Sequence, residues 1–271
     1  MERRPLGETG LTVPAVGMGT WQTFDVRFPA DVESRRELVT AALDVGCDLF
    51  DSSPMYGEAE RVLAHALAGR RDRALVATKV WTSDREAGER QIQDAMSLYG
   101  GFVDVYQVHN LVAVSHWLPA LRALKAEGKV RVVGVTHYAQ SSFADLARIM
   151  RSGHVEQVQL PLNVRDRAAE RELLPIAADL GIGVLVMRPL GEGALPRRAP
   201  QPDKLAPLRE YGVTTWAQAL LKWILSDPRV SCVIPATSRV HHARDNAAAG
   251  DPPWFDEGAR EYVAGLAEGR A

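Results

Sequence analysis

The stretch that decides the fold is Leu49-Phe50-Asp51-Ser52-Ser53-Pro54-Met55-Tyr56-Gly57. A short apolar run ends at Asp51, a turn marked by two serines and a proline follows, and a helical pattern begins after Gly57. Barrel enzymes present reactive side chains in this way, on the loops where strands end. Taken alone, the pattern is more often a helix cap and a packing tyrosine. Its interpretation therefore depends on the rest of the chain.

The unit of an apolar run followed by a helical pattern recurs along the sequence. We expect strands at residues 13–19, 47–50, 74–79, 103–108, 130–135, 155–160, 182–187 and 230–234. We expect helices at residues 31–45, 58–67, 86–99, 115–128, 141–150, 168–180, 214–225 and 240–248, with Ser115 as the cap of the fourth. Residues 3–13 read as a small hairpin, residues 188–207 as a loop, and residues 256–266 as a terminal helix.

Buried apolar runs that do not alternate with polar residues are typical of parallel strands. The predicted fold class is therefore α/β: a (β/α)8 TIM barrel with an N-terminal β-hairpin and a short C-terminal helix, as one domain over residues 1–271. A doubly wound open sheet is the alternative. It should carry a G-x-G-x-x-G loop, but Gln22 stands where the third glycine would follow Gly17 and Gly19.

Composition limits the classes of function. The chain has 271 residues, of which 46% are hydrophobic, enough for one large core. A formal net charge of −2 gives no reason to expect nucleic acid or an anionic membrane as a partner. Cys47 and Cys232 lie in apolar runs, and no export signal follows Arg3-Arg4, which together predict free buried thiols and a cytoplasmic location. No zinc-binding spacing occurs, so no metal site is predicted.

Four strand-end residues make a coherent chemical set. Tyr56 can donate a proton, and a positive charge on Lys79 is expected to lower its pKa. Asp51 can pair with Lys79 and orient it. His109 can hydrogen-bond a substrate oxygen. A buried Lys–Asp pair and a strand-end histidine also have purely structural interpretations. Together, the four predict proton transfer to a carbonyl oxygen that receives a hydride.

Several motifs resemble those of the aldo-keto reductases. These are Asp51 to Gly57, Lys79 after Ala-Thr, and His109 after Gln-Val, and the opening Leu6-Gly7-Glu8-Thr9-Gly10-Leu11-Thr12-Val13 is similar to bacterial members. The resemblance covers almost the whole chain. It implies an enzyme that binds NADPH without a Rossmann motif and reduces aldehydes or ketones to alcohols, with a small-molecule carbonyl compound as substrate. It also implies that Tyr56 is the general acid, that Lys79 and Asp51 tune it, and that His109 orients the carbonyl.

The resemblance assigns cofactor contacts position by position. The residues expected to bind the cofactor are Gly19, Thr20, Trp21, Thr136, His137, Gln159, Met187, Arg188, Pro189, Leu190, Ala236, Thr237, Ser238, Arg239, His242, Asp245 and Asn246. Thr136-His137 stands where the family has Ser-Asn, and Met187-Arg188 stands where an aromatic residue often stacks on nicotinamide. Arg239 is expected to pair with the 2′-phosphate of NADPH. Substitutions near it keep NADH open as the cofactor.

The expected substrate pocket is rich in aromatic side chains. Its predicted lining is Trp21, Phe24, Met55, Trp81 and Asn110, which favours an apolar or aromatic carbonyl compound. Two other functions are compatible with a barrel. A metal-dependent barrel hydrolase is disfavoured because only His109 and His137 stand at strand ends. A non-catalytic, nucleotide-binding redox sensor remains open because the residues after the fifth and seventh strands depart from the family pattern.

Overall fold

The computed structural model describes residues 1–270, which include a sheet of eight parallel strands. The strands of this sheet are β3 (Met18–Gly19), β4 (Leu49–Asp51), β5 (Leu75–Val80), β6 (Val103–His109), β7 (Val130–Thr136), β8 (Gln157–Pro161), β9 (Gly183–Met187) and β10 (Cys232–Val233). They pair in chain order from β3 to β10, each parallel to the next. This order is that of a (β/α)8 barrel, so the predicted fold class is confirmed.

The ring closes where β3 and β10 meet. Isolated parallel bridges join Val16 to Val233 and Gly19 to Ala236. The Gly17 amide donates to the Val233 carbonyl at 2.9 Å, and the Gly19 amide donates to the Pro235 carbonyl at 3.1 Å. Because the closure consists of single bridges, β3 and β10 are only two residues long, shorter than the runs predicted from the sequence.

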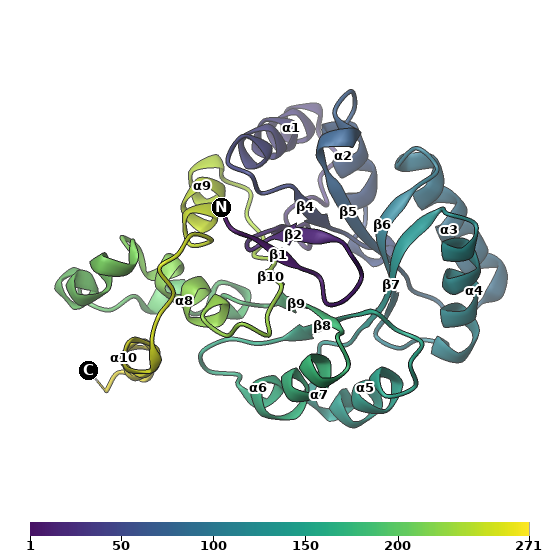
Figure 1. Ribbon diagram of the computed structural model, residues 1–271. Coiled ribbons are helices and arrows are strands. Elements are labelled where there is room, and N and C mark those ends of the chain that lie inside the picture. The colour runs from purple at the N-terminus through teal and green to yellow at the C-terminus, as the bar shows by residue number, and fades with distance from the viewer. Residues whose placement is uncertain (271) are drawn as a thin grey trace.

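Helices surround the ring of strands (Figure 1). They are α1 (Pro29–Asp44), α2 (Ala59–Ala66), α3 (Arg85–Leu98), α4 (Val114–Ala126), α5 (Phe143–Met150), α6 (Ala168–Glu172), α7 (Leu174–Asp179), α8 (Trp216–Leu225), α9 (Val240–Ala248) and α10 (Glu257–Glu268). α9 has the bounds predicted from the sequence, and most other helices differ from prediction by a few residues.

Three local predictions need correction. The helix expected over residues 168–180 is divided at Leu173, just before Pro175, whose ring cannot continue the preceding helical hydrogen bonds. Ser115 lies inside α4 and is not its cap; the helix follows Ala113, which has a left-handed φ of 47° and makes no side-chain cap. The loop expected over residues 188–207 contains short 3₁₀ segments, the longest at Pro202–Tyr211.

The predicted hairpin, β1 (Arg3–Pro5) and β2 (Thr12–Pro14), closes the end of the barrel where the strands begin. Figure 1 shows it lying across the ring of strands. Its side chains Leu6, Leu11 and Val13 join an apolar cluster with barrel residues such as Leu49 and Val132. At Gly7 the φ is +57° and an added Cβ would lie 2.2 Å from the Gly181 carbonyl oxygen, so only glycine fits this approach of hairpin to barrel.

Both cysteines are buried and free, as the sequence predicts. Cys232 is part of the apolar cluster beneath the hairpin, and Cys47 lies in the larger core between strands and helices. Burial raises the pKa of both thiols. In the part of the chain that the structure describes, no helix is long and apolar enough to cross a membrane.

Candidate active site

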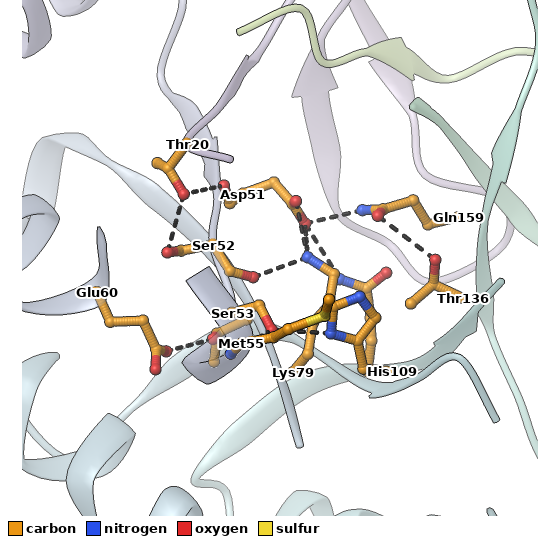
Figure 2. A network of polar contacts seen from close by, with 12 residues as sticks. Thr20, Asp51, Ser52, Ser53, Met55, Glu60, Lys79, His109, Thr136 and Gln159 are labelled. Carbon is orange, nitrogen blue, oxygen red and sulfur yellow. Dashed lines mark hydrogen bonds and ion pairs between the residues drawn. The ribbon is translucent and has the colours of Figure 1, made fainter. Parts of the chain in front are cut away.

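A buried ion pair lies at the other end of the barrel, where the strands terminate. Lys79 Nζ, near the end of β5, donates to both carboxylate oxygens of Asp51, the last residue of β4, at 2.8 and 2.7 Å (Figure 2). It also donates to the Ser52 carbonyl at 2.7 Å. Both residues are almost inaccessible to water, at 0% exposure for Lys79 and 2% for Asp51. All three ammonium hydrogens therefore have acceptors, which is what a buried lysine requires.

Two glutamines complete the shell of Asp51. Gln159 Nε2 donates to Asp51 Oδ1 at 2.8 Å, and Gln107 Nε2 approaches the same oxygen at 3.3 Å. Burial of Lys79 lowers its pKa, but the charge of Asp51 and the hydrogen bond to its carboxylate act the other way, and the pKa of Lys79 is raised overall. The lysine is therefore held as a cation beneath the cavity.

Tyr56 is placed above this pair by a tight turn. Residues Pro54–Tyr56 form one 3₁₀ turn, and Ser53 caps it by accepting the Met55 amide hydrogen at 3.2 Å. Gly57 ends the turn with a φ of 62°. The Tyr56 ring centroid lies 5.2 Å from Lys79 Nζ. Serine, proline and glycine in this order thus position the ring against the ammonium group.

The pKa of Tyr56 moves in the direction opposite to the prediction. Burial raises it, and this effect exceeds the lowering by the nearby charge of Lys79. The expectation of a lowered pKa neglected desolvation, which disfavours a phenolate in a partly closed cavity. The phenol consequently keeps its proton at neutral pH.

His109 ends β6 and faces Tyr56. Their ring centroids lie 5.7 Å apart with an angle of 88° between the rings. Its Nδ1 lies 2.8 Å from Ser53 Oγ. Burial lowers the pKa of His109 to about 2, with the charge of Lys79 as the next cause. The imidazole is therefore neutral and carries a single N–H.

A cavity of about 470 Å³ opens over these residues. Its size falls in the range of small-molecule sites. The lining residues are Gly19, Thr20, Trp21, Gln22, Thr23, Asp51, Met55, Tyr56, His109, Asn110, Tyr138, Gln159, Met187, Arg188, Pro189, Leu190, Glu192, Gly193, Ile234, Pro235 and Ala236. Most of the residues named from the sequence at the strand ends are thus brought together.

Two predicted pocket residues lie elsewhere. Phe24 is fully buried in the core between strands and helices and does not line the cavity, because the turn after Thr20 directs it inward. Trp81 is 39% exposed and lies beside His109, with ring centroids 6.4 Å apart, outside the cavity lining. Trp21, Met55 and Asn110 do line the cavity.

The strand-end pair Thr136-His137 does not line the cavity. Thr136 is fully buried, and its hydroxyl lies 3.4 Å from Gln159 Oε1. His137 Nδ1 accepts the Ala139 amide hydrogen at 3.0 Å, and its Nε2 lies 3.1 Å from Ser142 Oγ. Both ring nitrogens are therefore used by the loop itself. The neighbouring Tyr138 is the residue of this loop that lines the cavity.

Arg188 connects two loops at the rim of the cavity. Its guanidinium carbon lies 4.7 Å from the centroid of the Tyr138 ring, and its Nε makes an ion pair with Glu192 at 2.9 Å. Its backbone has a left-handed φ of 53°. This residue is thus a preformed cation beside Met187, the position at which the resemblance leads one to expect an aromatic ring.

The predicted phosphate-binding segment follows β10. α9 begins directly after Arg239, as expected, and no side chain caps its first turn. In contrast, Thr215 and Gln218 form a full capping box at α8. Ser238, Arg239 and His242 are exposed, whereas Thr237 and Asn246 are buried. Open N-terminal amides beside an exposed arginine are suited to a phosphate.

Sequence reasoning missed several lining residues. Gln22, Thr23, Tyr138 and Pro235 each adjoin a residue that it named, and Ile234 lies two residues before Ala236, so a wider window around every strand end would have included them. Glu192 and Gly193 come from a loop whose path the sequence pattern does not give. Ser53 stands within the stretch from Leu49 to Gly57, but nothing in a sequence indicates that its hydroxyl reaches β6.

The fold and the site together define a barrel enzyme with a tyrosine over a buried lysine–aspartate pair. A family model described as "Aldo/keto reductase family" matches residues 15–261, and the chain belongs to this family, which is one of oxidoreductases. The family resemblance stated from the motifs is therefore confirmed.

Individual relatives are distant. The chain is similar to aldo-keto reductase YhdN of Bacillus subtilis, with 29% identity over 72% of this chain and 64% of that protein's length. An NADH-specific methylglyoxal reductase of Escherichia coli is 28% identical over 72% of this chain and 69% of that protein. An aldo/keto reductase from Klebsiella pneumoniae in complex with NADP and acetate superposes with a TM-score of 0.81 at 25% identity, covering 97% of this chain and 94% of that one.

Proposed function

We propose that this protein reduces aldehydes or ketones to alcohols, with NADPH as the hydride donor and NADH as the alternative. The observation that carries the proposal is the placement of Tyr56 and His109 on one cavity, above the buried pair of Lys79 and Asp51. Family membership and the similarity to a methylglyoxal reductase support a small carbonyl substrate.

The residues divide the work by position. A reduced nicotinamide, when bound, supplies the hydride. Tyr56 donates its phenolic proton to the carbonyl oxygen as negative charge develops there. His109 donates a hydrogen bond to the same oxygen and fixes its direction. The Lys79 cation, held by Asp51, stabilises the phenolate that Tyr56 becomes when it donates its proton.

The residues present fit a dinucleotide. The exposed guanidinium of Arg239 and the uncapped first turn of α9 would hold a phosphate group, and Arg239 would favour NADPH over NADH. Gln159 and Met187 line the cavity where the nicotinamide would lie. Arg188 would take the place of a stacking ring. The apolar lining from Trp21 and Met55 favours an apolar or aromatic carbonyl compound.

The test combines cofactor binding with turnover. NADPH and NADH are titrated into the wild-type protein and into Tyr56→Phe, and oxidation of the reduced cofactor is followed with a panel of aldehydes and ketones. We expect Tyr56→Phe to lower kcat by roughly 10²- to 10⁴-fold, the weight of a general acid, while cofactor affinity changes less than a few fold. Full activity in Tyr56→Phe would overturn the assignment of the proton donor.

The same titration separates the alternative function. A non-catalytic redox sensor on this fold would bind the cofactor tightly. It would not oxidise the reduced cofactor with any carbonyl compound of the panel. Rapid oxidation by the wild-type protein would reject the sensor. Failure to bind either nucleotide would overturn both functions.

A further inference from the structure

The hydroxyl of Ser53 touches the imidazole of His109, one of the residues around the cavity. Ser53 Oγ lies 2.8 Å from His109 Nδ1, and both residues are buried, at 0% and 6% exposure (Figure 2). His109 lines the cavity, whereas Ser53 does not. The serine can therefore affect a substrate only through other residues, and His109 is the cavity residue that its hydroxyl touches.

Counting hydrogens fixes the direction of this hydrogen bond. Ser53 Oγ already accepts the Met55 amide hydrogen at 3.2 Å. Its own hydrogen needs an acceptor, and His109 Nδ1 is the side-chain partner in reach. If Nδ1 carried the proton instead, the buried serine hydrogen would have no acceptor there, which is costly. The satisfied arrangement has the hydroxyl donating to Nδ1.

A neutral imidazole has one N–H, so an accepting Nδ1 places that hydrogen on Nε2. Burial and the charge of Lys79 keep His109 neutral, which excludes the form that donates from both nitrogens. Nδ1 is occupied by Ser53, and Nε2 is the nitrogen left to serve the cavity.

We propose that Ser53 is a positioning residue that holds His109 in the tautomer whose Nε2–H donates to the carbonyl oxygen of the substrate. The benefit to turnover rests on the proposed function, whereas the choice of tautomer does not. The turn that caps with Ser53 also carries Tyr56, so one serine sets both hydrogen-bond donors of the site: the tyrosine through the turn, the histidine through its ring.

The deciding experiment reads the tautomer directly. The protein is labelled with ¹⁵N in its histidine rings, and nitrogen–proton correlation spectra are recorded near neutral pH without cofactor. The His109 signals are assigned by their disappearance in His109→Asn. We expect an unprotonated Nδ1 and a protonated Nε2 in the wild-type protein. In Ser53→Ala we expect this preference to weaken or invert, because Nδ1 has lost its donor.

Kinetics provide the second readout. We expect Ser53→Ala to lower kcat by roughly three- to tenfold, the weight of one buried neutral hydrogen bond, with KM and NADPH affinity changing less than twofold. Ser231→Ala is the matched control, since Ser231 is also buried and its Oγ accepts the Val184 amide hydrogen at 3.3 Å, away from the cavity. It should leave the His109 spectrum and kcat unchanged.

Failure of this inference is distinct from failure of the proposed function. A wild-type Nδ1 that carries the proton would overturn the tautomer assignment, even if Ser53→Ala did not fold. An unchanged His109 spectrum in Ser53→Ala would show that another contact selects the tautomer. Absence of carbonyl reduction in the wild-type protein would overturn the proposed function and leave the spectroscopic result standing.

Discussion

The two ends of the barrel are made from the same strands but packed in opposite ways. Where the strands begin, hairpin residues Leu6 and Leu11 meet barrel side chains such as Leu49 in an apolar cluster. Where they end, Asp51 and Lys79 are equally buried but charged, and each is surrounded by hydrogen-bond partners. Between Leu49 and Asp51, the change from one environment to the other takes two residues of β4.

The difference shows how one fold divides stability from chemistry. Burial of apolar side chains stabilises the folded state and requires no hydrogen-bond partners, so the hairpin end can stabilise the barrel. A buried ion pair contributes little net stability, because desolvation offsets its attraction, yet losing one partner is expensive. The polar end therefore contributes to catalysis more than to stability. Variants at the hairpin end should lower stability, and variants at the polar end should lower turnover.

The largest effect should come from breaking the ion pair. Lys79→Met leaves the Asp51 carboxylate buried with only neutral partners. We expect about 3–5 kcal/mol lower stability in urea unfolding and a loss of turnover. The double variant Asp51→Asn with Lys79→Met removes the orphaned charge and should recover part of the stability but no turnover. Equal stability of Lys79→Met and wild type would show that the pair is not buried as described.

A smaller effect is expected at the hairpin end. Leu6→Ala removes a fully buried side chain that does not line the cavity. We expect stability to fall by about 3 kcal/mol, as for other buried leucines, while kcat measured well below the unfolding temperature remains at the wild-type value. Urea unfolding and steady-state kinetics on the same preparation check both. A fall in kcat would mean that the two ends are coupled.

The smallest effect concerns pH. His109 is neutral when folded, with a pKa near 2, whereas an unfolded histidine binds a proton below about 6.5. The unfolded state thus binds more protons in this range, so the stability due to His109 is present above pH 6.5 and lost as pH falls. Between pH 8 and pH 5 the loss is about 2 kcal/mol.

Glu60 changes the pH dependence of folding stability in the opposite direction, so its contribution must be distinguished from that of His109. Burial raises its pKa to about 7, so the folded state binds a proton between about pH 7 and the unfolded value of about 4.3, and stability from this group rises as pH falls. The measurement is therefore the difference between wild type and His109→Asn in urea unfolding at pH 5 and pH 8. Parallel pH dependences would contradict a neutral buried His109.

The barrel could be predicted because the spacing of apolar residues indicates which positions are buried. The same pattern of a buried strand followed by a helix with one apolar face recurs in every unit. The sequence also named Asp51, Lys79 and His109, because strands in chain order bring their ends to one rim. It did not predict the short strands β3 and β10, the inward turn of Phe24 or the raised pKa of Tyr56. These depend on closure, loop path and desolvation, which are properties of the assembled ring.

The two buried cysteines can serve as probes of local opening of the barrel. Cys232 belongs to the cluster beneath the hairpin and Cys47 to the core outside the sheet, and neither is accessible in the native state. A thiol-reactive dye can then label the native protein only when the chain opens. Mass spectrometry can separate the labelling rates of the two cysteines. The rate at Cys232 would report how often the hairpin of β1 and β2 opens, and the rate at Cys47 would report how often the helices separate from the sheet.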